Sequence, residues 1–169
     1  MLKIPHHVKK IFLEQQMIVV SSVDQNLMPN ISPRTTFTII DDVIYWIELF
    51  RHKSFKNFQF SDWISVASFD KEKLKGFQLK GKVTMLQDEE KKKNVSLQII
   101  DKLTRLHKER ILKQLGNKVP TIASFKPFII YSSNPVELTD IPMIIGMDPK
   151  IESLIGGTHM KSKFGFEIS

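Results

Sequence analysis

The feature that most constrains the fold is a series of short apolar segments, rich in β-branched residues, with only short turns between several of them. Each segment has the length of one strand, and Asn, Asp, Gly or Pro residues mark many of the turns. Six segments are predicted to be strands: 17–23, 30–40, 43–47, 64–69, 76–86 and 123–133. Such close spacing leaves too few residues for the crossovers of a parallel sheet. The predicted fold class is therefore mainly β, an antiparallel barrel with flanking helices.

Three helices accompany these strands in the prediction. They cover residues 5–16, 54–60 and 88–116. The first places Val8, Ile11 and Phe12 on one face at helical spacing. The third begins with acidic residues, which suit the positive end of the helix dipole, and ends at Gly116. Within this helix, Val95, Ile99, Leu103 and Leu106 repeat at helical spacing.

Gly81 and Pro127 each interrupt a predicted strand. A glycine inside a strand typically marks a bulge or a bend, of the kind that the wall of a barrel needs. Proline cannot donate a ladder hydrogen bond, so it restricts its strand to an edge or a bulge. We therefore expect the strand 76–86 to bend at Gly81.

Cationic and hydroxyl-bearing residues gather between residues 30 and 57, where two predicted strands lead into the short helix. Arg34, Thr35 and Thr36 lie on the second predicted strand, and Arg51-His52-Lys53-Ser54 opens the helix. The start of a helix presents free N–H groups and the positive end of its dipole. Lys and Arg add charge, and Ser adds a hydrogen-bond donor. The sequence therefore predicts a site for a phosphate-bearing ligand.

The order of these motifs resembles the flavin-binding split-barrel family, the group around pyridoxamine 5′-phosphate oxidase, over roughly residues 5–134. The shared pattern is a turn, an N-x-S-P strand start, a strand, a Lys-Ser-x-x-Asn helix start and a Gly-x-x-x-x-Gly strand. These motifs occupy residues 24–28, 30–33, 43–47, 53–57 and 76–81. The resemblance implies a six-stranded antiparallel split barrel of the FMN-binding type, and a homodimer with flavin at the subunit interface.

By this resemblance, a set of residues on three strands and the helix start would bind FMN. The set is Arg34, Thr35, Thr36, Phe37, Trp46, Ile47, His52, Lys53, Ser54 and Gln78. The first four would line the ribityl chain and the ring edge, with Arg34 and Lys53 neutralising the phosphate. His52 stands where the family has an arginine, and Gln78 could replace a ring-contacting glutamine of the oxidase. Each residue also has an ordinary alternative: Arg34 could form a surface ion pair, and Trp46 could belong to the core.

The resemblance implies an FMN-dependent oxidoreductase that exchanges hydride or electrons with a small organic substrate, with NAD(P)H as a candidate donor. A flavin carries its own redox chemistry, so no catalytic side chain is assigned. The Arg- and Trp-rich C-terminal motif of the oxidase is absent, because residues 120–169 contain neither residue. Vitamin B6 oxidase activity is therefore not inferred. The alternatives are a non-catalytic flavin carrier or sensor, a deazaflavin-binding barrel, and a haem-binding barrel with His159 as axial ligand.

The composition of the chain excludes several classes of function. The chain has no cysteine, which excludes disulfides and thiol catalysis. It has neither a signal-peptide pattern nor an apolar run long enough for a membrane helix, so we expect a cytoplasmic protein without a membrane partner. The net charge of +7 is spread largely over predicted loops and one helix, so we expect no nucleic-acid partner. No histidine spacing indicates a metal site.

Residues 1–134 are expected to form the barrel. Residues 135–169 are expected to form an extension that packs on the barrel or on a partner subunit, or is mobile.

Overall fold

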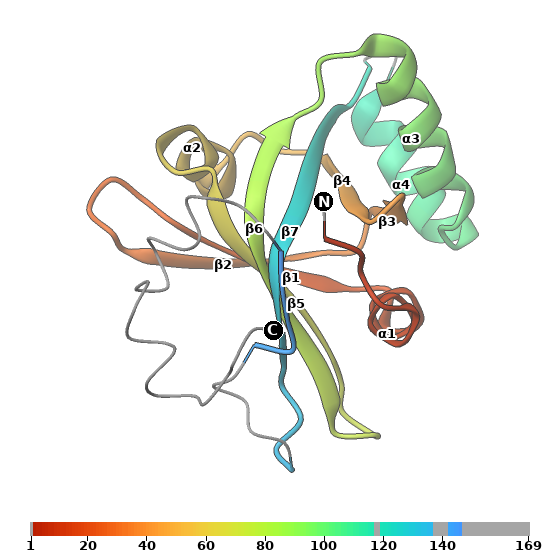
Figure 1. Ribbon diagram of the computed structural model, residues 1–169. Coiled ribbons are helices and arrows are strands. Elements are labelled where there is room, and N and C mark those ends of the chain that lie inside the picture. Colours follow the sequence, from red (N-terminus) through yellow and green to blue (C-terminus); the bar gives the residue numbers. More distant parts are fainter. Residues whose placement is uncertain (1, 117–118, 137–141, 147–169) are drawn as a thin grey trace.

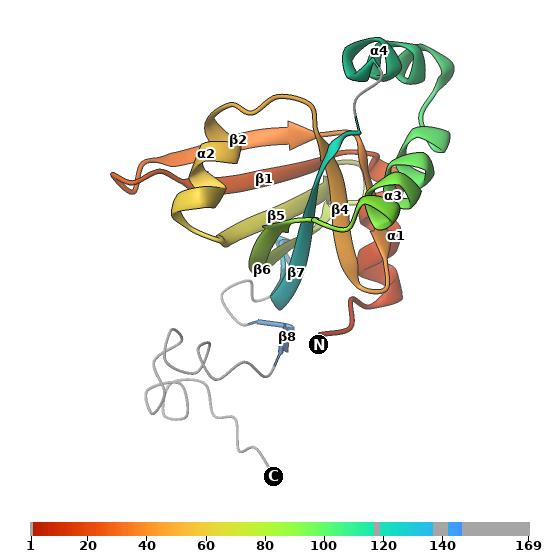
Figure 2. The same ribbon diagram turned by 90° about the horizontal axis from the view of Figure 1, so that it is seen from above.

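One antiparallel sheet dominates the computed structural model, which describes residues 2–116, 119–136 and 142–146. Its strands are β1 (Ile18–Val23), β2 (Pro29–Arg34), β3 (Phe37–Ile40), β4 (Val43–Glu48), β5 (Trp63–Asp70), β6 (Lys75–Met85), β7 (Thr121–Ser132) and β8 (Ile144–Ile145). The order across the sheet is β2-β1-β5-β6-β7-β4-β3, and β8 pairs with β7 (Figure 1). Figure 2 shows the sheet curling from β2 and β1 round to β7 and β4. The predicted split-barrel fold class is confirmed.

The strand predicted over residues 30–40 is in fact two strands, which raises the number of long strands from six to seven. β2 ends at Arg34 and β3 begins at Phe37, and these two strands form the opposite edges of the sheet. The chain passes from one edge to the other at Thr35 and Thr36. The Thr36 carbonyl accepts a hydrogen bond of 3.0 Å from the Ile47 N–H, which anchors the crossing to the end of β4. Because only two residues separate β2 from β3, the two edges of the curled sheet lie close together at this point.

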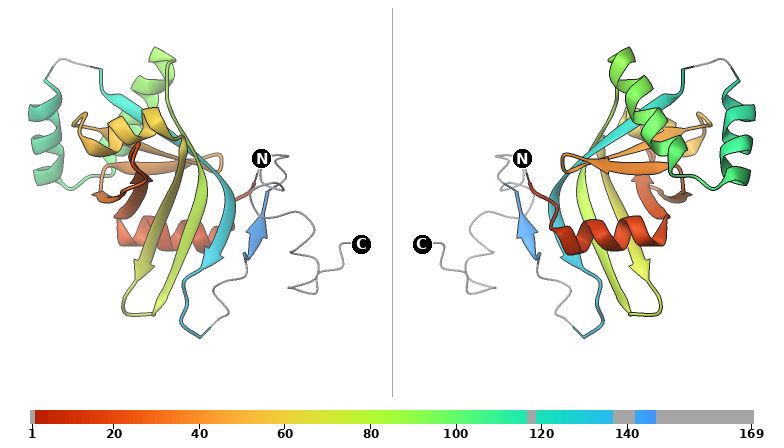
Figure 3. Two further views of the ribbon diagram at one scale, coloured as in Figure 1. Left: turned by 90° about the vertical axis from the view of Figure 1, so that its left-hand side faces the viewer. Right: turned by 90° about the vertical axis from the view of Figure 1, so that its right-hand side faces the viewer.

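Four helices cover parts of the sheet: α1 (His6–Gln15), α2 (Lys53–Phe60), α3 (Glu89–Asp101) and α4 (Arg105–Leu115). α1 packs on β5 and β6, α2 on β1 and β2, and α3 on β3, β4 and β7. Figure 3 shows that α1 and the α3–α4 pair cover different parts of the sheet. Among the described residues, no helix is long and apolar enough to cross a membrane.

The single helix predicted over residues 88–116 is also wrong, because it breaks between α3 and α4. Thr104 takes an extended conformation as the N-cap of α4, a position that Thr favours. A straight helix would rise by about 1.5 Å per residue and carry its second half away from the sheet. The break instead lets Ile111 join Val95 and Ile99 in one apolar cluster against the outer face of β4.

Two apolar cores lie on the two faces of β4. Ile44 and Trp46 belong to the core inside the curled sheet, together with Phe12 of α1. Tyr45 and Ile47 belong to the cluster that α3 and α4 cover. Every residue of β4 is therefore buried, which explains why this strand reads as a continuous apolar run rather than an alternating one.

The bulge predicted at Gly81 is confirmed. Lys80 pairs with Ile129 and Gly81 pairs with Pro127, so Phe128 is an extra residue on β7. Pro127 thus lies where the ladder is already irregular and its missing N–H costs little. The bulge lets β6 and β7 bend together along the wall of the barrel.

Asp70, the last residue of β5, gives the fold a pH dependence. Its carboxylate accepts the backbone N–H groups of Lys73 at 3.1 Å and Glu72 at 3.0 Å, and pairs with the Lys73 ammonium at 3.1 Å. These interactions, the backbone N–H of Lys73 first, hold the pKa of Asp70 below its ordinary value of 3.8. The stabilisation that Asp70 contributes is therefore complete above pH 3.8 and is lost as the pH falls through the lowered pKa of the folded state.

Urea unfolding at several pH values on both sides of this range tests the expectation. The Asp70→Asn variant keeps an acceptor oxygen but cannot titrate, so its free energy of unfolding should fall less steeply toward acid than that of the wild type. Equal slopes for the two proteins would show that Asp70 contributes nothing to acid sensitivity.

Candidate cofactor-binding cleft

A cleft of about 600 Å³ opens where β2, the end of β4 and the start of α2 meet. This is within the usual size range of ligand sites, roughly 300–1,000 Å³. Its lining comes from β2 and the crossing to β3 (Asn30, Ser32, Pro33, Arg34, Thr35, Thr36), from β4 and the segment after it (Ile47, Glu48, Leu49, Phe50, Arg51, His52), from α2 (Lys53, Ser54, Lys56) and from α4 (Ile111). Of the residues expected to bind a cofactor, Arg34, Thr35, Thr36, Ile47, His52, Lys53 and Ser54 line this cleft.

Three of the expected residues lie elsewhere. The Trp46 side chain is fully buried in the inner core, where its ring packs edge-on against Phe58 at 6.1 Å between centroids. Phe37 is also buried and borders a smaller depression beside α1 and α3. Gln78 lies on β6, paired with β5 and β7 in the middle of the sheet. The structure does not bring these three side chains to the cleft lining.

Cations gather at one end of the cleft, around the start of α2. Lys53, Lys56 and His52 form no ion pair or hydrogen bond through their side chains with any other residue that the structure describes. The Arg51 guanidinium lies over the Phe55 ring at 5.4 Å, and His52 stacks on Phe50 at 5.4 Å between centroids. The contact with Phe55 orients Arg51 without cancelling its charge. This end therefore offers unneutralised positive charge beside the N–H groups of a helix start.

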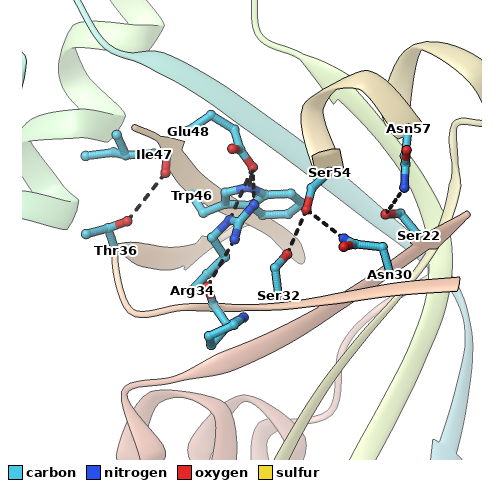
Figure 4. Close-up of polar contacts among 11 residues, drawn as sticks. Ser22, Asn30, Ser32, Arg34, Thr36, Trp46, Ile47, Glu48, Ser54 and Asn57 are labelled. Atoms are coloured by element: carbon cyan, nitrogen blue, oxygen red, sulfur yellow. Dashed lines mark hydrogen bonds and ion pairs between the residues drawn. The ribbon is translucent and has the colours of Figure 1, made fainter. Parts of the chain in front are cut away.

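A hydroxyl and amide cluster fixes α2 to the sheet beside these cations (Figure 4). The Ser54 hydroxyl lies 2.8 Å from that of Ser32 and accepts a hydrogen bond of 3.1 Å from the Asn30 amide. Asn57, one turn further along α2, donates to the Ser22 hydroxyl at 3.1 Å. Because Ser54 and Asn57 are both buried, the inner face of this helix is partly polar. These bonds set the position of the helix start relative to β2.

Arg34 and Glu48 form an ion pair in the wall of the cleft. The Glu48 Oε1 atom accepts hydrogen bonds from Arg34 Nε at 3.2 Å, from Arg34 Nη2 at 2.9 Å and from Trp46 Nε1 at 2.7 Å. The side chain of Glu48 is only 2% exposed and that of Arg34 is 17% exposed. Arg34, expected from the sequence to neutralise a phosphate, therefore has its charge matched by a buried carboxylate. Sequence reasoning missed Glu48, although an acidic residue that ends an apolar strand is a signal worth following.

A family model described as pyridoxamine 5′-phosphate oxidase matches residues 4–125. The chain belongs to the pyridoxamine 5′-phosphate oxidase family. No curated protein matches the chain. Family membership agrees with the split-barrel fold.

Solved structures with the same fold include proteins with different ligands. HupZ of Group A Streptococcus is 17% identical, with a TM-score of 0.62, over 79% of this chain and 96% of its own. HutZ, the haem storage protein of Vibrio cholerae, is 14% identical, with a TM-score of 0.55, over 75% and 91%. An FMN-binding protein of Nostoc punctiforme, related to pyridoxamine 5′-phosphate oxidase, is 11% identical, with a TM-score of 0.55, over 75% and 78%. At these identities the similarity establishes the fold only.

Proposed function

We propose that the cleft binds FMN and that the protein is an FMN-dependent oxidoreductase acting on a small organic molecule. The observation that carries this proposal is the set of unpaired cations at the start of α2, which faces a cleft large enough for a nucleotide-sized ligand. Lys53, Lys56 and the N–H groups of the first helical turn would hold the phosphate. Ile47, Leu49 and Ile111 offer apolar surface for a ring. The family includes FMN-binding proteins, which supports the same ligand.

The bound flavin would supply the redox chemistry. The chain's own residues would bind and orient it. The cations would hold one end, and the crossing at Thr35 and Thr36 places backbone beside the cleft.

We include a homodimer in the proposal, because exposed apolar side chains lie on segments around the cleft. Ile31, Phe50 and Phe60 are each more than half exposed. A second copy of the chain would cover such surface. A cytoplasmic location belongs to the same proposal.

Haem is the second candidate ligand, because the fold is shared with the haem storage protein HutZ. His159, the axial ligand that a haem site in this chain would require, lies outside the described residues, as does most of the C-terminal extension. The absorption spectrum of the purified protein, with mass spectrometry of any molecule released on denaturation, separates the two. Flavin bands support the proposal, and a Soret band overturns it in favour of haem. Steady oxidation of NAD(P)H by the FMN-loaded protein would distinguish an enzyme from a flavin carrier.

Removal of two cations should weaken FMN binding strongly. We expect Lys53→Ala combined with Lys56→Ala to lower the affinity for FMN about a hundredfold, because each charged contact to a phosphate contributes about 1.5 kcal/mol or more. Riboflavin, which lacks the phosphate, should bind both proteins equally. Fluorescence titration of the apoprotein with each flavin measures the difference.

Lys71→Ala combined with Lys75→Ala is the matched control. It removes the same charge from exposed positions at the β5–β6 turn, away from the cleft. If the control pair lowers FMN affinity as much as the cleft pair, the effect is one of net charge and the phosphate site is misplaced.

A further inference from the structure

Glu48 has a carboxylate oxygen for which the protein supplies no partner. Its three donors, two from Arg34 and one from Trp46, all reach Oε1. No group among the described residues donates to Oε2. Every fully buried polar side-chain atom in the described part of the chain has a hydrogen-bond partner. Because Oε2 has no partner, it must be at least partly exposed. Glu48 lines the cleft with a side chain only 2% exposed, so the cleft is where this oxygen is accessible.

Arg34 presents donors beside that oxygen. A guanidinium carries five N–H donors. The structure uses three of them, two on Glu48 and one, from Nη1, on the Pro33 carbonyl at 3.0 Å. Arg34 also lines the cleft, where its remaining donors are available to a ligand. The pair is neutral as a whole and offers an acceptor and donors side by side.

This arrangement suits a hydroxyl group better than a phosphate. A hydroxyl both donates and accepts, so it can bond to a carboxylate oxygen and a guanidinium N–H together. A phosphate only accepts at neutral pH and would be repelled by the buried carboxylate. The unpaired cations that suit a phosphate lie instead around the start of α2, on Lys53 and Lys56.

We propose that the Arg34–Glu48 pair determines specificity for the hydroxylated chain that joins the phosphate of the ligand to its ring. The cleft would then select a phosphate monoester of a polyol over one of a plain alkyl chain. This inference rests on the proposed function, in which Lys53 and Lys56 hold the phosphate. Of the two roles that the resemblance gave Arg34, it keeps the contact with the hydroxylated chain and removes the contact with the phosphate.

Two small phosphate monoesters test the inference by isothermal titration. Ribitol 5-phosphate and butyl phosphate carry the same phosphate group, but only the first has hydroxyl groups along its chain. The wild type should prefer ribitol 5-phosphate by at least about tenfold, as expected for one charge-assisted hydrogen bond. Glu48→Gln should lose most of this preference and bind butyl phosphate at least as tightly as before. Glu89→Gln, at an exposed position on α3, is the control for the lost charge.

A second variant shows whether a lost preference comes from the missing pair or from a misfolded protein. Arg34→Met combined with Glu48→Met removes the pair without leaving either charge buried alone, a change that folded proteins tolerate. It should bind both monoesters equally. A preference for ribitol 5-phosphate that survives in the folded variants overturns the inference, and so does the absence of any preference in the wild type.

Titration with FMN separates this inference from the proposed function. If FMN fails to bind the wild type while the Glu48-dependent preference is present, the cofactor is wrong and the hydroxyl specificity stands. If FMN binds and the preference is absent or insensitive to Glu48, the cofactor stands and the pair has only a structural role.

Discussion

Arg34→Ala should destabilise the folded protein by about 3 kcal/mol, in addition to any effect on ligand binding. Loss of one partner from a buried ion pair leaves the other charge without compensation, which typically costs about 3–5 kcal/mol. Glu48 is almost completely buried and would keep only the Trp46 indole as a donor. Because the Arg34 side chain is 17% exposed, water would enter after its removal, and we expect the lower end of the range.

Urea unfolding of Arg34→Ala and of Arg105→Ala provides the measurement and its control. Arg105 also pairs with a glutamate, Glu109, but both side chains are largely exposed at 93% and 61%. Exposed pairs of this kind contribute roughly 0–1 kcal/mol. If Arg34→Ala costs no more than Arg105→Ala, Glu48 does not depend on Arg34 and the description of this wall of the cleft is wrong.

The expected loss of stability in Arg34→Ala decides which variants can be used in binding experiments. An Arg34→Ala/Lys53→Ala variant is the direct test of a phosphate site that uses both cations. In this structure it would mix a loss of stability with a loss of affinity. Lys53 and Lys56, which have no partner among the described residues, are the positions where a change in affinity can be measured on an intact fold.

Local sequence signals predicted most of the strands and the place of the cleft. Short apolar segments between turn residues located β1, β5 and β6, and Gly81 with Pro127 located the bulge. The cationic helix start was visible as Arg51-His52-Lys53-Ser54, since helix capping and charge are local properties. Each of these signals lies within a few residues of the structure that it specifies.

The Arg34–Glu48 pair could not be predicted in the same way. The two residues are 14 positions apart and meet only because the chain crosses from one sheet edge to the other at Thr35 and Thr36. Trp46 was ambiguous for a related reason. Every residue of β4 is buried, so no alternation distinguishes a side chain in the core from one in the cleft.

Gly81→Ala should destabilise the protein by about 3 kcal/mol, at the upper end of what overpacking usually costs. A Cβ atom at this position would lie 2.1 Å from the Lys126 carbonyl oxygen and 2.8 Å from the Pro127 Cα. Both are backbone atoms of β7, so no side-chain rotation relieves the clash. Relief requires β6 and β7 to separate at the bulge, where Pro127 already limits the conformations of the chain.

Gly116→Ala is the control, measured by the same urea unfolding. It distinguishes a clash of the new Cβ with neighbouring backbone from the other effects of replacing a glycine. Gly116 has φ of +55° and ψ of −129°, but its replacement by alanine meets no atom of the described residues within 4 Å of the new Cβ. Its replacement should therefore cost only the backbone strain of a residue with positive φ and extended ψ, about 1–2 kcal/mol and less than at Gly81. If the two variants lose the same stability, the strands part at Gly81 with little cost. Close packing of β6 on β7 would then not be what fixes the bend in the barrel wall.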